Sequence, residues 1–247
     1  MTRTISLIQA QARSSLRDPA TVFFTFLFPL LLLVVFARAF GQVPNADGTL
    51  AMQGVGPNVV AFGIAYVGMF TAAQSIVEWR VSGMSRVLYA APIRTNSILG
   101  ANLAVGLGLG ITQAILLVLL AVMPGLNMIL SPHALAALPI VVLGIWTFFS
   151  LGMLVGTFTN SVAAASGAIN AVVLPMAYVS GAMLPIEMLP DWAIAIGRAM
   201  PMRYMVDAIG GGLTGVAPGS TVILSVVVLA ASGAVFFASA AKLVRWV

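Results

Sequence analysis

The sequence has 247 residues, of which 61% are hydrophobic and 7% charged, and no soluble fold could bury so large an apolar fraction, since soluble domains carry about 25% charged residues. Cysteine is absent, which excludes a disulfide framework, a thiolate metal site and a cysteine nucleophile. The net charge of +5 comes from basic residues scattered around apolar runs rather than clustered on a polar domain, so we expect no nucleic-acid partner.

Six apolar runs predict transmembrane helices, because each is long enough to cross about 30 Å of hydrocarbon at 1.5 Å per residue. They cover residues 22–40, 59–77, 98–123, 135–157, 162–183 and 222–241. None shows the two-residue alternation of a barrel strand, and backbone in lipid must form its hydrogen bonds internally. We therefore predict an all-α fold, with one polytopic domain over residues 1–247.

The basic residues also predict the orientation of these six spans. With the N-terminus in the cytoplasm, the inner side holds eight of them and the outer side three. The inner set is Arg3, Arg13, Arg17, Arg80, Arg86, Arg94, Lys242 and Arg245, and the outer set is Arg38, Arg198 and Arg203. This excess follows the positive-inside rule, and six spans then return the C-terminus to the cytoplasm.

The first 19 residues have the pattern of a helix that lies in the membrane interface. Its apolar face consists of Ile5, Ile8, Ala12 and Leu16, and a polar strip beside it consists of Gln9, Arg13 and Arg17. Asp18 and Pro19 end this helix, and Pro19 fits the first position of the next one. The alternative is a frayed tail with helical tendency.

The segment 78–94 joins the second and third spans on the predicted cytoplasmic side. Val81, Met84 and Leu88 share a face at helical spacing, and Pro92 closes the segment. This pattern predicts a short amphipathic helix. The alternative is an ordinary basic loop that only fixes the topology.

The segment 184–216 is too apolar for a solvated loop and too often interrupted by proline to span. We predict one or two short re-entrant helices in the outer leaflet, with aromatic residues at headgroup depth. Its marker residues are Pro185, Pro190, Trp192, Pro201 and Tyr204. Non-helical backbone at that depth requires protein or a water-filled cavity beside it, so the segment is expected to cap one.

These segments, in this order, resemble the permease subunits of ABC-2 type transporters, the exporter family that includes daunorubicin-type drug efflux and polysaccharide or lipid export permeases. The motifs are Phe28-Pro29-Leu30 in the first span, then Glu78, Gly83 and Pro92, then Ser180-Gly181, Pro185-Ile186, Leu189-Pro190-x-Trp192 and Pro201-Met202-x-Tyr204. The last series is the most specific. Many family members carry Arg after the step that matches Asp207-Ala208-Ile209, whereas this chain has Gly210.

The resemblance implies that the chain is the permease of an ATP-driven exporter in the bacterial cytoplasmic membrane. It implies a second permease subunit, identical or different, and two cytoplasmic ATPase subunits that bind ATP and Mg²⁺. One feature of the sequence agrees with ATP binding on a separate subunit, which is that this chain has no Walker A motif. Its only lysine, Lys242, lies outside any glycine loop. We therefore expect a transport subunit and not an enzyme, with no cofactor of its own.

Two groups of residues are expected to serve transport. The ATPase-coupling group is Glu78, Arg80, Gly83, Arg86 and Pro92. By resemblance, the path is lined mainly by the first, second and fifth spans, and its polar residues on the second and fifth are Thr71, Gln74, Ser166, Asn170 and Tyr178. The second group could equally form helix-packing hydrogen bonds. Abundant Met, Phe and Leu favour an apolar or amphipathic substrate, such as a drug, a lipid or a lipid-linked glycan.

Three other functions were weighed. A secondary transporter or channel also suits six spans, but coupling to an ion gradient usually needs acidic groups inside the membrane, and the predicted spans contain none there. An intramembrane enzyme would need ionisable or nucleophilic groups at the same depth. A membrane assembly or scaffold protein stays open as an alternative. The glycines at 106, 108 and 110 are interpreted as helix-packing positions.

Overall fold

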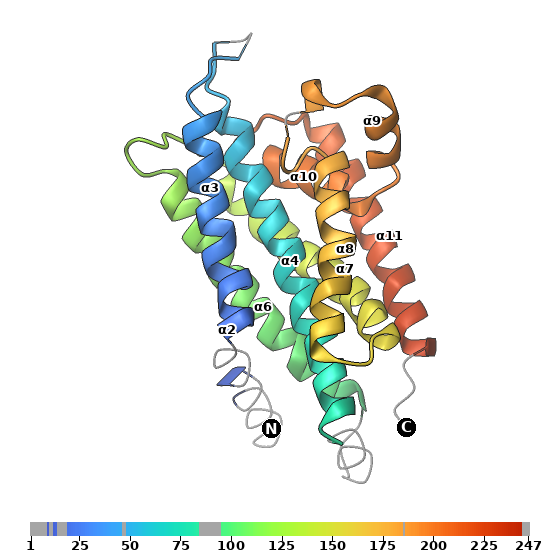
Figure 1. The fold of residues 1–247 in the computed structure, drawn as a ribbon. Helices are drawn as coiled ribbons and strands as arrows, with labels where there is room; N and C mark the ends of the chain where they lie inside the picture. The colour runs from blue at the N-terminus through green and yellow to red at the C-terminus, as the bar shows by residue number, and fades with distance from the viewer. Residues whose placement is uncertain are drawn as a thin grey trace.

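The computed structural model describes residues 9, 12–13, 19–45, 48–83, 95–184 and 186–243, which form long helices that run up and down beside one another (Figure 1). The long helices are α4 (Met52–Val81), α6 (Thr95–Ala121), α7 (Ala137–Phe158), α8 (Val162–Val179) and α11 (Gly219–Leu243). All five contain an apolar window long enough to cross a membrane. The β structure in the described part is one isolated bridge, between Pro44 and Leu50, so the predicted all-α fold is confirmed.

The first predicted span is helical from residue 19 to residue 39 but changes its winding on the way. It consists of α2 (Pro19–Val22), the π-helical turn η1 (Phe23–Leu27) and α3 (Phe28–Ala39). The N–H of Phe28 bonds the carbonyl of Phe23, five residues back, and Pro29 follows without an N–H to donate. The apolar helix Phe23–Ala39 is shorter than the other five, so the count of six spans stays a prediction.

Helix α4 forms the centre of the molecule. All of its 18-residue apolar window is buried, whereas 17% of the corresponding window of α11 is buried. Its neighbours are α3, α6, α7, α8 and the short helix α10 (Pro201–Leu213). The apolar window of α4 has the lowest mean hydropathy of the five, 1.6, and polar side chains in a membrane helix face the interior of the bundle rather than lipid, which explains this central place.

Helix α4 begins seven residues before the predicted span because its first turns tolerate Pro57. A proline at this position removes the N–H that would bond the carbonyl of Gln53. The hydroxyl of Thr214, directly after α10, lies 3.0 Å from that carbonyl and 3.0 Å from the carbonyl of Gly210, so its one proton is shared between the two. The loop beyond α10 therefore completes the α4 helix.

Glycines set the distance between α4 and its neighbours. A side chain at Gly152 of α7 would collide with the backbone of Met69, and one at Gly156 would lie 3.0 Å from the backbone of Ala73. The predicted packing role holds for Gly106 and Gly110, which face α4 and α7. It is wrong for Gly108, which has open space where a Cβ would lie.

Three short helices follow α8, where the sequence predicted one or two. They are η3 (Ile186–Met188), α9 (Asp191–Gly197) and α10. Gly197 of α9 packs on the carbonyl of Val179 at the end of α8. Met205 of α10 fills the space left by Gly144 of α7. The depth of these helices in a membrane stays a prediction.

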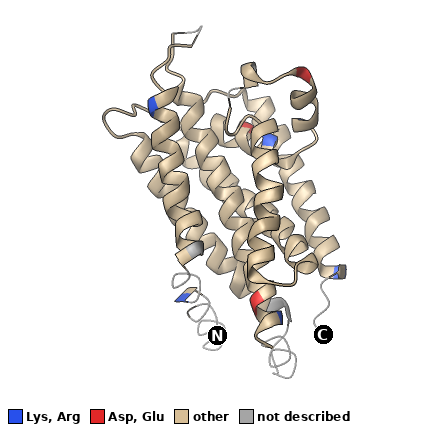
Figure 2. Ribbon diagram, viewed as in Figure 1, with Lys and Arg blue, Asp and Glu red and all other residues tan. Residues whose placement is uncertain are grey.

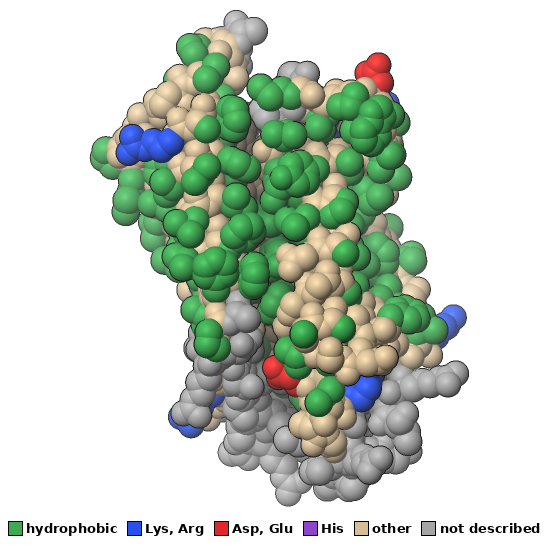
Figure 3. Space-filling model, in the orientation of Figure 1, with side chains coloured by type: hydrophobic (Ala, Val, Ile, Leu, Met, Phe, Trp, Pro, Cys, Tyr) green, Lys and Arg blue, Asp and Glu red, His purple; other side chains and the backbone are tan. Residues whose placement is uncertain are grey.

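Charged residues gather at the two ends of the bundle, as Figure 2 shows, and apolar side chains cover most of the middle of the face drawn in Figure 3. Arg80 and Lys242 lie in the last turns of α4 and α11, and Arg38 lies in the last turn of α3, which runs in the opposite direction. We refer to these ends as the Arg80 end and the Arg38 end. The predicted interfacial helix over 1–19 and the predicted helix in 78–94 lie mostly outside the described residues.

Candidate functional site

A row of polar side chains on α4 faces α8. Asn58, Tyr66 and Gln74 are eight residues apart, which places successive members about 80° apart around the helix at 3.6 residues per turn. Each of the three donates a hydrogen bond to α8 or to the turn that follows it. The row therefore runs along most of the contact between the two helices.

The bonds in this row are short and connected. The Tyr66 hydroxyl donates to Oδ1 of Asn170 at 2.7 Å, and the Nδ2 of Asn170 donates to the carbonyl of Ser166 at 2.9 Å. The Nε2 of Gln74 donates to Oγ of Ser166 at 2.8 Å, and that hydroxyl donates to the carbonyl of Val162. Leaving polar groups unpaired in a low-dielectric interior is costly, so these bonds fix the register of α4 against α8. The Oε1 of Gln74 is the one buried side-chain atom of these residues without a partner in the described part of the chain.

Tyr66 also joins this network to the first helix. Its ring stacks on Phe24 of η1 and Phe70 of α4, with ring centroids 5.8 and 5.7 Å apart. Phe28 and Phe62 approach it at 6.4 and 5.6 Å. One side chain thus connects η1, α3, α4 and α8.

The structure brings together three of the five residues predicted to line the path: Gln74, Ser166 and Asn170. Thr71 instead faces α6, where its Cγ2 would lie 3.5 Å from a Cβ at Gly106. Tyr178 is 48% exposed on α8. The three residues that meet form helix-packing hydrogen bonds here, and their role in lining a path stays a prediction.

Another side of α4 forms a second seam, with α6. Four positions one turn apart on α4 meet four on α6: Ser75 with Asn102, Thr71 with Gly106, Val67 with Gly110, and Gly63 with Gln113. The Ser75 hydroxyl donates to Oδ1 of Asn102 at 3.1 Å. The amide of Gln113 is buried against Gly63, and neither of its polar atoms has a hydrogen-bond partner in the described part of the chain.

Arg80, predicted to couple to an ATPase, bonds within the chain. Its Nη1 donates to the carbonyl of Thr159 at 2.9 Å, and two longer contacts of 3.5 Å reach the carbonyls of Thr157 and Gly156. These carbonyls lie at the end of α7, where a helix leaves its last acceptors unpaired and favours a cation. Arg80 therefore ties the end of α4 to the end of α7.

Gly83 ends α4 by its backbone conformation. Its φ is +71°, in the left-handed region that favours glycine, and no atom lies within 4 Å of the place where a Cβ would stand. The predicted role of Gly83 in coupling to an ATPase stays a prediction. Glu78 precedes it on α4, whereas Arg86 and Pro92 of the same predicted group lie outside the described residues.

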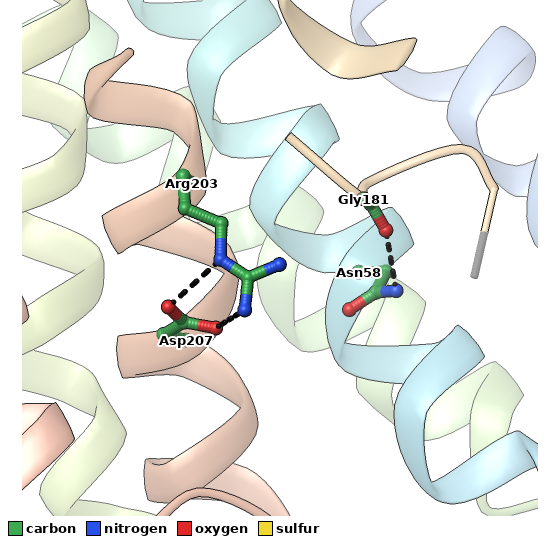
Figure 4. A network of polar contacts seen from close by, with 4 residues as sticks. All are labelled: Asn58, Gly181, Arg203 and Asp207. Atoms are coloured by element: carbon green, nitrogen blue, oxygen red, sulfur yellow. Dashed lines mark hydrogen bonds and ion pairs between the residues drawn. The ribbon is translucent and has the colours of Figure 1, made fainter. Parts of the chain in front are cut away.

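A second polar cluster lies near the Arg38 end, and Figure 4 shows its four residues. Arg203 of α10 forms an ion pair with Asp207, with Nη2 and Oδ1 3.0 Å apart. Burial raises the pKa of Asp207, and the charge and hydrogen bond of Arg203 oppose that shift. Asn58 donates to the carbonyl of Gly181 at 2.8 Å, and Gly181, with φ +86°, ends α8.

The residues predicted to mark the outer segment occupy different surroundings. Trp192 is 65% exposed and Pro190 is exposed, whereas Pro201 is buried at the start of α10. The Tyr204 hydroxyl donates to the carbonyl of Arg198 at 2.8 Å and so holds α9 to α10. Pro185 lies outside the described residues.

Sequence reasoning missed Asn58, Tyr66 and Gln113. No simple spacing signalled Asn58 and Tyr66, because positions eight residues apart lie about 80° apart around a helix and so do not share a face. Gln113 had no signal beyond being a lone amide in an apolar run. In the described part of the chain, no group of three or more His, Cys, Asp or Glu residues is placed to hold a metal ion.

Comparison with known proteins gives a consistent picture. A family model described as ABC-2 type transporter matches residues 2–213. The chain is 25% identical over 201 residues to a protein of Cyanophora paradoxa described as "Putative transport permease ycf38". That alignment covers 78% of this chain and 68% of the relative.

Proposed function

We propose that this chain is the membrane-spanning subunit of an ATP-driven exporter, because it belongs to the ABC-2 type transporter family and is a transport permease. Its substrate is apolar or amphipathic: a drug, a lipid or a lipid-linked glycan. It works beside a second permease subunit and a pair of cytoplasmic ABC ATPase subunits. In this arrangement the Arg80 end faces the cytoplasm.

The observation that supports an ATP-driven mechanism is the position of the charges. In α3, α4, α6, α7, α8 and α11, Asp, Glu, Lys and Arg occur only in the last turn or next to it, and His does not occur. Transporters coupled to proton or sodium gradients rely on ionisable groups at membrane depth. We propose that this permease takes its energy from outside the membrane, and that a partner supplies it, because this sequence contains no Walker A motif.

The proposed path follows the contact of α4 with α8. Helix α4 is covered on all sides, so a path along it requires α8 to move away, with the second subunit completing the wall. Such opening breaks the bonds of Tyr66 and Gln74 to α8 and presents their polar groups to the passing substrate. Hydrogen bonds between membrane helices average about 0.6 kcal/mol, so a step of ATP hydrolysis supplies enough energy to break them.

The proposed coupling uses Arg80. The segment 78–94 joins α4 to α6, and Arg80 joins the same point to the end of α7 and its turn toward α8. A push by the ATPase on this segment therefore reaches α4, α6 and α7 together. Packed helices transmit such a shift as rigid bodies rather than absorbing it.

Purification of the tagged chain in mild detergent, followed by identification of co-purifying proteins, tests the partnership. Co-purification of an ABC ATPase is expected, and the complex in proteoliposomes should move a fluorescent amphipathic probe only with ATP and Mg²⁺. Probe movement by the permease alone under an imposed proton or sodium gradient would contradict the proposal and favour a secondary transporter. The supporting result is probe movement that needs ATP and that stops when the ATPase is catalytically inactive.

A further inference from the structure

A groove lies between α3 and α6 on the Arg38 side of the bundle. It has a volume of about 400 Å³, within the roughly 300–1,000 Å³ of ligand pockets. Seven side chains line it, all Leu, Val or Met: Leu30, Leu31, Val34, Leu116, Leu119, Leu120 and Met123. Five of the seven are between 39% and 54% exposed, so the groove opens toward the surroundings of the bundle.

A cation stands directly beyond one end of this groove. Arg38 follows Val34 by one helical turn, and its Nη2 lies 4.0 Å from the place where a Cβ of Gly125 would stand, two residues after Met123. The guanidinium therefore bridges the ends of the two helices that form the groove. Among the described residues the one ion pair joins Arg203 to Asp207, so Arg38 has no acid partner there.

The loop around Arg38 is held in place by hydrogen bonds. Nε2 of Gln42 donates to the carbonyl of Gly125 at 3.4 Å, and the N–H of Gly125 donates to Oδ1 of Asn127. The φ of Gly125 is +97°, a conformation that glycine adopts readily. The turn after α6 is thus fixed beside Arg38 rather than covering the groove.

We infer that this groove binds one acyl chain of an anionic phospholipid, whose phosphate is held by Arg38. An apolar channel that ends at a cation at the membrane surface matches the two parts of such a lipid in the right order. A second copy of the chain is the competing occupant, but it would bring no phosphate to Arg38, and the crosslinking test below separates the two.

This inference does not depend on export or on ATP, because it concerns only the membrane surface of the folded permease. It predicts a bound lipid on one defined side of the subunit. Helix α11 offers another exposed apolar face for comparison. Ile223 and Val227 on α11 are 68% and 60% exposed and serve as the reference face.

The test places the full chain in nanodiscs that contain phosphatidylglycerol with a photoactivatable group on one acyl chain, followed by peptide mass spectrometry. Labelling is expected to concentrate on residues 30–34 and 116–123, several-fold above residues 223–227. Leu119→Trp should fill the groove and lower this labelling. Leu224→Trp, at a position of similar exposure on α11, should not.

The headgroup is tested by repeating the labelling with zwitterionic phosphatidylcholine that carries the same group. Arg38→Gln should lower the preference for phosphatidylglycerol about five-fold, the selectivity that one basic residue contributes at a membrane surface. Arg198→Gln, which removes another exposed arginine near the Arg38 end, should leave the preference unchanged. Either of two results would overturn the inference. One is uniform labelling of all lipid-facing segments. The other is that phosphatidylglycerol and phosphatidylcholine label the groove equally well, both in the unmodified chain and in Arg38→Gln.

A single cysteine separates a lipid from a second subunit as the occupant. The chain has no cysteine, so Leu119→Cys gives one defined thiol. If a second copy covered the groove, a short bis-maleimide would join two Leu119→Cys chains, and the lipid inference would be wrong. With a lipid in the groove, the thiol should stay uncrosslinked and be protected from apolar maleimides by added phosphatidylglycerol.

Discussion

The hydroxyl of Tyr66 lies 2.7 Å from Oδ1 of Asn170 and joins the buried helix α4 to α8. The same ring stacks on Phe24 from the first helix, so three parts of the chain meet at one side chain. Any movement of α8 relative to α4 must first break this bond. Tyr66 is therefore the most informative place to probe that contact.

Tyr66→Phe keeps the ring and removes the bond. We expect the free energy of unfolding in detergent to fall by about 0.6–1.7 kcal/mol, the range measured for hydrogen bonds between membrane helices. Tyr178→Phe is the matched control, because Tyr178 is 48% exposed on α8. Equal effects of the two variants would show that the Tyr66 bond does not hold α8.

Arg80→Gln should destabilise the isolated permease by up to about 2 kcal/mol, because the C-terminal end of α7 loses the cation that its carbonyls bond. Thermal unfolding without any ATPase is the measurement, and Arg198→Gln is the control at an exposed arginine. If Arg80 only contacted a partner, the isolated chain would keep its full stability and only transport would fall.

Substitutions at Gly83 test whether glycine is needed there for its backbone conformation or for the space that it leaves. Gly83→Ala should cost about 1–2 kcal/mol, because a Cβ disfavours the left-handed conformation at φ +71°. Gly83→Asn should cost less, since Asn adopts that conformation more readily. Both fit the open space around Gly83, so equal losses for Ala and Asn would mean that the backbone conformation is not the reason for glycine here.

Gly110 and Gly108 form a matched pair within α6. Gly110→Leu should destabilise by about 1–3 kcal/mol, because its side chain would meet Ile145 and Val67 within 2.6–3.1 Å. Gly108→Leu should be neutral or stabilising, since its Cβ would point into open space and leucine favours a helix. Chemical unfolding of the two variants in the same detergent measures the difference, and a loss at position 108 as large as at 110 would contradict the packing described.

A double-mutant cycle tests whether the hydroxyl of Thr214 replaces the N–H that Pro57 lacks. Thr214→Val leaves the carbonyl of Gln53 unpaired and should cost about 1–3 kcal/mol. In a Pro57→Ala background the new N–H can bond that carbonyl, so the same Thr214→Val change should cost less. A strictly additive double variant would show that the Thr214 hydroxyl does not substitute for the N–H that proline lacks.

Much of the fold follows from the sequence alone. Composition and run length determine that the chain is helical and crosses a membrane, because apolar runs of this length have no other stable place. The prolines after residue 184 predicted that this region does not form one long helix, although they predicted one or two short helices where the structure has three. The motif series from Ser180 to Tyr204 was specific enough to indicate the family that the match over residues 2–213 shows.

The tertiary structure alone decided which polar residues meet. Gln74 and Ser166 are 92 residues apart, and no local pattern gives the rotation of α4 and α8 that brings them to 2.8 Å. The same holds for Arg80, whose charge suggested an external partner, whereas the nearby end of α7 supplies its acceptors. Local sequence sets where a membrane helix begins and ends, but its rotation depends on the packing of every neighbour at once, and that rotation selects the side chains that face each other.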